Sequence, residues 1–297
     1  MARIALSGAS GLIGVRLRAA LAGDGHRVVP LVRGAAGNGE IAWDPARGQL
    51  DSARLAGVEA FIHLSGEPVA GVRWSAARKR AIAESRLAST RLVAESLAGL
   101  SPKPALLCAS ATGYYGDRGS EWLDEASPCG TGFLAGVCAQ WERACEPARE
   151  AGLRVVNLRL GVVLDRDDGA LPALLRTHRL GLGGRLGSGA QYVSWISSAD
   201  AVGAIRHALV SPGLVGPLNV VSPAPIQNAE LSRTLARVLH RPAFLPVPAA
   251  LLRLALAEAA DELLLASQRV RPAKLAASGF RFSDPELEGA LRRILCG

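Results

Sequence analysis

Hydroxyl side chains gather directly after one apolar segment, where they could bind a substrate oxygen or transfer a proton. The segment 104–110 (Pro-Ala-Leu-Leu-Cys-Ala-Ser) has the composition of a buried strand. The hydroxyls at its carboxyl end belong to Ser110, Thr112, Tyr114 and Tyr115. Ligands of open α/β sheets bind outside the carboxyl ends of the strands, and a tyrosine there can act as a general acid or base. These four residues are our first catalytic or substrate-binding candidates.

Glu67 is a second candidate for proton transfer. It follows the apolar segment 60–65, so its carboxylate would face the same crevice and could exchange a proton if it were buried. A plain turn role is the alternative. His63 lies inside that strand and is expected to be a hydrogen-bonded core residue. Asp44, at the end of the segment 41–44, is expected either near an adenine or as a cap of the next turn.

A glycine-rich turn near the start of the chain predicts an anion site. The apolar segment 3–7 predicts a strand, Gly8, Gly11 and Gly14 follow it, and apolar residues recur at helical spacing over 12–21. Strand, glycine turn and helix in this order form the dinucleotide-binding corner of many sheets, where exposed N–H groups hold a pyrophosphate. The alternative is an ordinary tight turn. The predicted cofactor contacts in this turn are Gly8, Ser10, Gly11, Leu12, Ile13 and Gly14.

Arg33 indicates which dinucleotide would bind. In NAD enzymes an acidic residue roughly 20 residues past the glycines bonds the ribose 2′-hydroxyl. Here Arg33 ends the predicted strand 27–33, and the next acidic residue is Glu40. A guanidinium can clamp a 2′-phosphate, so the sequence favours NADP(H) over NAD. A solvated arginine at a strand end is the alternative.

Composition excludes several classes of protein. The 297 residues are 49% hydrophobic, and the net charge of +8 is scattered without a dense basic run, which argues against nucleic-acid binding. Five cysteines without C-x-x-C spacing argue against a disulfide framework or a zinc site, and we expect no metal. The late apolar stretch 249–266 carries several charges, and no leader precedes the first strand. We therefore expect a soluble, cytoplasmic protein without a membrane association.

The order of the predicted elements defines the fold class. Strands are predicted at 3–7, 27–33, 41–44, 60–65, 104–110, 154–160 and 217–221. Helices are predicted at 12–21, 75–97 (with Ser75 as N-cap), 132–151 and from 198, and 228–297 is mostly helical. This alternation predicts an α/β protein, a Rossmann-type doubly wound parallel sheet with a smaller, mostly helical C-terminal substrate lobe. Residues 1–168, joined by 198–222, would form the cofactor domain, and 169–197 with 223–297 the substrate lobe, including a glycine-dense loop at 181–191.

With these residues in view, the chain resembles an atypical extended short-chain dehydrogenase/reductase of the epimerase family, close to nucleoside-diphosphate-sugar epimerases. The resemblance runs nearly end to end. It depends on motifs that include Gly8–Gly14, His63–Glu67, Ser85-Arg86, Ser110–Gly116, Trp141-Glu142, Leu158–Leu164, Ser194–Ile196, Asn219 and Ser267–Val270. It implies an NADP(H)-binding domain, phosphate or ribose contacts at Arg33 and Arg86, and cofactor contacts at Leu64 and Ser65. Gly66, Arg159 and Val162, also at strand ends, complete our predicted cofactor set.

One departure from the resemblance puts the chemistry in question. Typical members of the superfamily carry Tyr-x-x-x-Lys on the helix after the strand at 104–110, as general acid/base and its partner. Counted back from Trp141-Glu142, these positions hold Leu134 and Cys138, and the usual hydroxyl on the strand falls near Ala111. Two hypotheses follow: an NADP(H)-dependent oxidoreductase or epimerase-like enzyme with a small-molecule substrate, or a non-catalytic NADP(H)-binding redox sensor. A homodimer, common among such folds, is left open.

Overall fold

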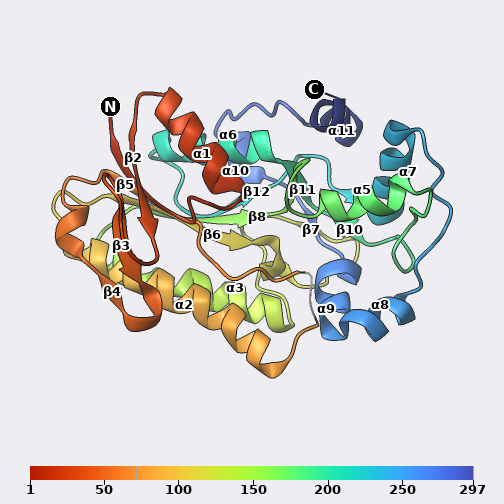
Figure 1. Ribbon diagram of the computed structural model, residues 1–297, viewed down its shortest axis with the longest axis horizontal. Coiled ribbons are helices and arrows are strands. Elements are labelled where there is room, and N and C mark those ends of the chain that lie inside the picture. Colours follow the sequence, from red (N-terminus) through yellow and green to blue (C-terminus); the bar gives the residue numbers. More distant parts are fainter. Residues whose placement is uncertain (71–72, 297) are drawn as a thin grey trace.

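A central eight-stranded sheet organises the computed structural model, which describes residues 1–70 and 73–296 (Figure 1). The strand order is β12-β8-β6-β5-β1-β2-β3-β4, and all neighbours are parallel except the β3–β4 hairpin. The strands are β1 (Arg3–Ser7), β2 (Arg27–Val32), β3 (Ile41–Asp44), β4 (Gln49–Leu50), β5 (Ala60–His63), β6 (Ala105–Ala111), β8 (Val155–Leu160) and β12 (Gly216–Val220). The chain runs outward from β1 in both directions, so a crevice forms at the carboxyl ends of β1 and β5.

Helices cover both faces of this sheet. Alternate residues of a strand point to opposite faces, so Ile4 and Leu6 of β1 pack in one core and Ala5 in the other. The first core includes α1 (Leu12–Gly23) and α6 (Ser198–Val210). The second includes α2 (Ala76–Ala98), α3 (Phe133–Arg143) and α4 (Glu146–Glu150). Both faces are thus buried, as parallel sheets require.

The remaining helices lie at one end of the molecule, beyond the carboxyl ends of the strands (Figure 1). α5 (Leu171–Arg179), α7 (Asn228–Leu239) and α11 (Leu287–Cys296) share one apolar cluster. α8 (Ala249–Leu256), α9 (Glu258–Ala260) and a π-helical turn (Asp261–Leu265) pack around Trp74 and Phe133. Short connecting elements are β7 (Trp122–Leu123), β9 (Val162–Leu164), β10 (Tyr192–Val193), β11 (Trp195–Ser197), β13 (Ile226–Gln227), β14 (Arg269–Val270), α10 (Ala273–Ala277) and 3₁₀ turns at Pro45–Arg47, Ser52–Leu55 and Thr112–Tyr115.

The predicted fold class is confirmed, with two local corrections. The helix expected over 132–151 breaks between α3 and α4, because Pro147 lacks an N–H and its ring would clash with a helical carbonyl four residues earlier. The two-residue strand β4 was not expected. Ser75 caps α2 as predicted, accepting a hydrogen bond from the Arg78 N–H (3.1 Å). Within the described residues, none of the helices is long and apolar enough to cross a bilayer.

Helix α1 approaches the end of β1 so closely that two glycines are required. Gly8 has φ +72°, and a Cβ there would lie 2.8 Å from the carbonyl carbon of Leu64. A Cβ at Gly14 would overlap the Gly8 carbonyl oxygen and lie 2.9 Å from Cα of Ala9. The first turn of α1 therefore lies directly on the turn that leaves β1.

Replacing Gly14 with alanine is expected to separate α1 from β1. Because the neighbouring atoms are backbone and cannot move aside, we expect a loss of about 1–3 kcal/mol in the free energy of unfolding. Urea denaturation measures it. Gly23→Ala, in the same helix with nothing within 4 Å of the added Cβ, is the matched control and should not destabilise the protein. Equal stability of the Gly14 variant and the wild type would contradict this packing.

Candidate functional site

The glycine turn presents an open helix start to the crevice. Gly11 is the N-cap of α1 and is exposed, and no side chain caps it. Its own N–H bonds the Gly8 carbonyl (3.1 Å), which closes the turn. The next N–H groups, at the start of α1, are those that bind anions at helix N-termini. Because Gly8 also lies against Leu64, the turn and the end of β5 form one surface. This geometry fits the pyrophosphate of a dinucleotide.

Arg33 and Arg86 flank this surface in different ways. Arg33 follows β2, is exposed, and forms no ion pair with any of the described residues. Arg86 lies on α2, next to Gly66. A Cβ added to Gly66 would lie 3.2 Å from the guanidinium carbon of Arg86. Its Nη1 donates to the Ile82 carbonyl (3.0 Å), its guanidinium lies 5.0 Å from the Trp141 ring, and burial lowers its pKa. Arg86 is thus held beside Gly66, whereas Arg33 is exposed after β2.

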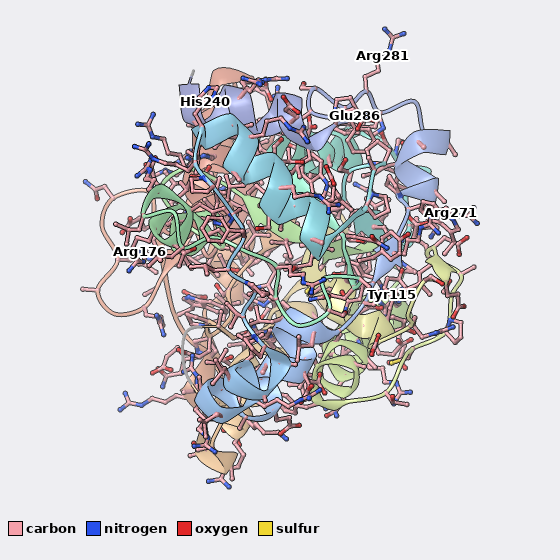
Figure 2. All side chains as sticks on the ribbon, turned by 90° about the vertical axis from the view of Figure 1, so that its right-hand side faces the viewer. Tyr115, Arg176, His240, Arg271, Arg281 and Glu286 are labelled. Carbon is pink, nitrogen blue, oxygen red and sulfur yellow. The ribbon has the colours of Figure 1, made fainter. Side chains whose placement is uncertain are left out.

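The hydroxyls after β6 do not all face the crevice. Ser110, Thr112 and Tyr115 are buried, and Tyr114 is the partly exposed one. The Tyr115 hydroxyl lies 2.7 Å from Asn219 Oδ1 and 2.9 Å from the Asp124 carbonyl, with the side chain in the interior (Figure 2). Burial raises the pKa of Tyr115 to about 12. Tyr115, one of our catalytic candidates, therefore has its hydroxyl bonded within the protein.

A buried ion pair lies behind the tyrosines. Arg159, at the end of β8, is 3% exposed and donates to Glu142 from Nε (2.8 Å) and Nη2 (2.9 Å). Its Nη1 donates to the Tyr115 hydroxyl (3.0 Å), and its guanidinium stacks 3.5 Å from the Tyr114 ring. Ser110 Oγ donates to Glu142 Oε1 (2.7 Å). Burial alone would lower the pKa of Arg159, but the bonds to Glu142 raise it, so the guanidinium stays charged.

Two residues predicted to meet a ligand, Ser110 and Arg159, are thus turned inward toward Glu142. We had named Glu142 only as part of the resemblance and had given it no role. No local pattern indicates this contact, because Glu142 lies on α3 and reaches across to β6 and β8. Tyr114 is partly exposed, and the Arg159 guanidinium contacts its ring. Glu142 therefore positions the residues that hold Tyr114.

The start of α3 carries the two positions at which the family pair is absent. A Cβ on Gly113 would lie 3.4 Å from Leu134 Cβ and 3.7 Å from Cys138 Sγ, so both residues face the turn after β6. Burial raises the pKa of the Cys138 thiol to about 12, which keeps it neutral. Neither side chain can supply the proton or the positive charge of a Tyr-x-x-x-Lys pair.

Glu262 lies over this helix start. Its carboxylate accepts hydrogen bonds from the N–H groups of Phe133 (2.8 Å) and Leu134 (3.0 Å). It comes from the π-helical turn, a feature often found at functional sites. Nearby, Lys79 binds Glu258 (2.8 Å). Sequence reasoning missed Glu262, because its partners lie 128 and 129 residues away. These contacts fasten the late helices onto α2 and α3 beside the crevice.

The other candidates have simpler environments. The Glu67 side chain is 39% exposed and pairs with Arg78 (3.3 Å), so it is not held away from water. His63 is a buried core residue, as expected, with Ser7 Oγ at 2.5 Å and Ser89 Oγ at 3.1 Å, and burial lowers its pKa to about 3. Asp44 caps the turn Pro45–Arg47, the second of the two expected roles. Val162 is 36% exposed on β9.

Comparisons with known proteins agree with this geometry. Residues 4–220 match the family model of the NAD dependent epimerase/dehydratase family, and residues 247–294 match a domain of unknown function (DUF1731). The chain belongs to the NAD dependent epimerase/dehydratase family. An epimerase family protein of Mycobacterium tuberculosis is 42% identical over 97% of this chain and 96% of its own length. The human epimerase family protein SDR39U1 is 35% identical over 99% of both chains.

Solved structures share the whole fold. The crystal structure of human SDR39U1 with NADPH superposes with a TM-score of 0.89, at 34% identity and with 98% of each chain covered. A UDP-N-acetylglucosamine 4-epimerase from Bacillus cereus superposes with a TM-score of 0.76 at 17% identity, with 99% of this chain and 98% of its own covered. That second likeness concerns the fold alone. The family resemblance read from the sequence is confirmed.

Replacing Glu142 with glutamine is expected to destabilise the protein strongly. The Arg159 guanidinium would remain buried without a counter-charge, which costs about 3–5 kcal/mol in the free energy of unfolding. Chemical denaturation measures the loss. Glu146→Gln, which removes an exposed partner of Arg149 from the neighbouring helix, is the matched control and should cost less than about 1 kcal/mol. Similar losses of unfolding free energy in the two variants would show that the buried Glu142–Arg159 pair stabilises the protein no more than an exposed ion pair does.

Proposed function

We propose that this protein is an NADP(H)-dependent oxidoreductase or epimerase-like enzyme that acts on a carbonyl or sugar-nucleotide substrate. The observation that carries the proposal is the open helix start at Gly11, joined to the end of β5 in one surface. The relative that was crystallised with NADPH has the same fold along the whole chain. The cofactor, when bound, would donate a hydride in its reduced form or accept one in its oxidised form. The residues that would hold it are those of the glycine turn, Leu64, Ser65, Gly66 and Arg86.

Arg33 supports NADP(H) over NAD as the cofactor. It follows β2, next to the strand that leads into the glycine turn, and none of the described residues forms an ion pair with its guanidinium. An arginine in this place can bind a 2′-phosphate with two parallel hydrogen bonds, which NAD cannot use. The choice of cofactor would then depend on this one side chain, since the pyrophosphate contacts are common to both dinucleotides.

Replacing Arg33 with alanine is expected to weaken NADPH binding by about tenfold or more and to leave NADH binding almost unchanged, because only NADPH loses charge-assisted bonds. Calorimetric titration of both cofactors measures this. Arg18→Ala, which removes an exposed charge from the middle of α1, controls for the general loss of positive charge. Absence of binding by either cofactor to the wild type would refute the proposed cofactor site.

Tyr114 is the proposed proton donor in place of the absent helix tyrosine. Of the four residues in the hydroxyl cluster, Tyr114 is the partly exposed one, and the Arg159 guanidinium lies 3.5 Å from its ring. A fixed positive charge at that distance favours a tyrosine that gives up its proton, the effect that the family obtains from lysine. Glu142 and Tyr115 hold the guanidinium in place. Ser110, Thr112 and Glu67 remain candidates for binding or secondary proton transfer.

A second candidate function is supported by the start of α3. Leu134 and Cys138 face the turn after β6 in place of a proton donor and its cation, and Glu262 covers their helix. A protein that binds NADP(H) and signals the redox state without catalysing a reaction would need no proton donor at these two positions. The substrate lobe proposed at 169–197 and 223–297 would then serve as the responding part.

Tyr114→Phe and Tyr115→Phe are expected to separate catalysis from stability. Loss of the proposed donor should lower the rate of NADPH oxidation with a panel of aldehydes, ketones and keto-sugars by about 100-fold or more, with stability unchanged. Loss of the Tyr115 hydroxyl should cost about 1–3 kcal/mol of stability, because Asn219 and Arg159 lose a buried partner. Full activity of Tyr114→Phe would exclude it as the donor. Tight NADPH binding without oxidation by any compound would favour the sensor.

A further inference from the structure

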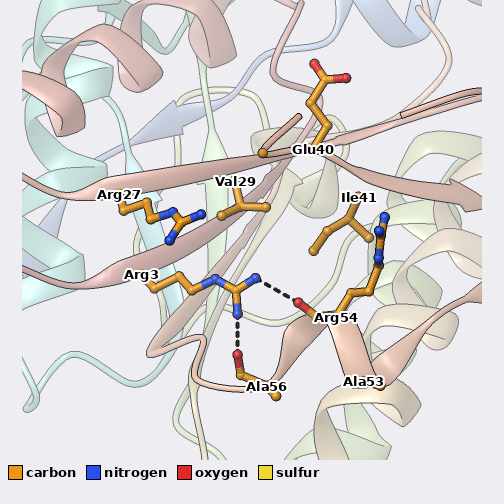
Figure 3. Close-up of a pocket in the computed structure, with 9 residues that line it drawn as sticks. Arg3, Arg27, Val29, Glu40, Ile41, Ala53, Arg54 and Ala56 are labelled. Atoms are coloured by element: carbon orange, nitrogen blue, oxygen red, sulfur yellow. Dashed lines mark hydrogen bonds between the residues drawn. The ribbon is translucent and has the colours of Figure 1, made fainter. Parts of the chain in front are cut away.

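A cavity lies at the opposite end of the sheet from the glycine turn. It has a volume of about 400 Å³ and lies at the amino ends of β1, β2 and β3 (Figure 3). Arg3 and Arg27 begin neighbouring parallel strands and are register partners. The glycine turn follows the other end of β1, about 16 Å away at the usual rise per residue. This cavity is therefore separate from the proposed cofactor site.

Guanidinium groups from three elements surround the cavity. Arg3 comes from β1, Arg27 from β2 and Arg54 from the 3₁₀ turn Ser52–Leu55. Arg3 donates to the carbonyls of Arg54 (2.9 Å) and Ala56, which fixes its guanidinium without neutralising it (Figure 3). The guanidiniums of Arg27 and Arg54 have neither a hydrogen bond nor an ion pair with any residue that the structure describes.

Nearby carboxylates do not pair with these arginines. Glu40 lines the cavity, but its Oε2 accepts a hydrogen bond from the Gly37 N–H (2.9 Å) and its carboxylate points away from the guanidiniums (Figure 3). Glu59 accepts from the main-chain N–H of Arg3 (3.2 Å) and forms no ion pair with it. Positive charge is thus concentrated at the cavity without a bound counter-charge from the described chain.

Apolar side chains form only part of the cavity wall, because polar atoms make up more of its accessible lining than apolar atoms. Val29 and Ile41, from β2 and β3, belong to the wall but are only 3% and 2% exposed, whereas Ala53 and Ala56 on the facing side are exposed. Volumes of roughly 300–1,000 Å³ are typical of small-molecule sites.

We propose that this cavity binds an organic phosphate of about nucleotide size. Guanidinium groups bind phosphate oxygens with two parallel hydrogen bonds, and three such groups from separate elements suit a group of multiple negative charge. The exposed methyl groups of Ala53 and Ala56 would contact a non-polar part of the ligand. Because Arg3 is already fixed by two carbonyls, little side-chain freedom is lost on binding. The site would bind its ligand while the crevice at the other end of the sheet holds a different one.

Calorimetric titration with ADP tests this site. ADP is titrated into the full chain with and without saturating NADPH, which occupies the glycine turn, and we expect ADP binding to persist when NADPH is saturating. Arg27→Ala combined with Arg54→Ala should weaken ADP binding by about tenfold or more, because two charge-assisted contacts are lost. The matched control combines Arg91→Ala with Arg241→Ala, which removes the same charge from exposed positions elsewhere and should change the affinity less than twofold.

Three outcomes would overturn the proposal. Absence of ADP binding to the wild type is the first. The second is ADP binding that NADPH abolishes and that the Arg27 and Arg54 double variant retains, which would place ADP at the glycine turn. The third is an equal loss of ADP affinity in the Arg27 and Arg54 double variant and in the control variant. That result would show that the loss comes from the lower net charge of the protein and not from this cavity. Pyrophosphate, titrated in the same way, measures how much the adenosine part of ADP contributes to binding, and ADP should bind more tightly than pyrophosphate.

Discussion

The contact between α1 and the turn after β1 is the constraint on which the candidate site depends. Gly14 leaves no room for a side chain above the Gly8 carbonyl, and Gly8 leaves none beside Leu64. These two contacts bring the start of α1, the end of β1 and the end of β5 to one place. The N–H groups of the helix start then point into the crevice where the strand order reverses. A larger residue at either position would move the anion site away from β5.

The Arg159–Glu142 pair has a similar organising role on the other side of the crevice. It joins β6, β8 and α3 through one carboxylate and one guanidinium, both nearly excluded from water. The pair fixes the two tyrosines differently: Tyr115 is bound through its hydroxyl, whereas Tyr114 is in contact only through its ring. The Arg159 guanidinium, from the end of β8, thus lies next to Tyr114, which follows β6 and is partly exposed.

Local patterns allowed much of this to be predicted from the sequence. The strands β1, β2, β3, β5, β6, β8 and β12, the cap at Ser75 and the glycine turn follow from short-range periodicity and turn chemistry, and they lie within one or two residues of the prediction. Leu134 and Cys138, which our count assigned to the Tyr and Lys positions of the motif, lie beside Gly113 in the turn after β6.

Long-range contacts explain what the sequence did not reveal. Glu262 reaches α3 across more than a hundred residues, and Glu142 acquires its role only when β6 and β8 lie side by side. Tyr114 and Tyr115 are neighbours in one 3₁₀ turn, so their different burial depends on the elements packed around them. The break before α4 is different, because Pro147 was visible in the sequence and its effect on the preceding turn was overlooked.

A crystal structure of this protein with NADPH would test the central claim most directly. Our account predicts the pyrophosphate at the start of α1, the 2′-phosphate bound by Arg33, and the nicotinamide C4 facing the Tyr114 hydroxyl across a space large enough for a carbonyl group. A nicotinamide ring that faces Leu134 and Cys138, with Tyr114 covered by protein, would contradict the proposed chemistry. A cofactor bound away from the glycine turn would contradict the whole account of the site.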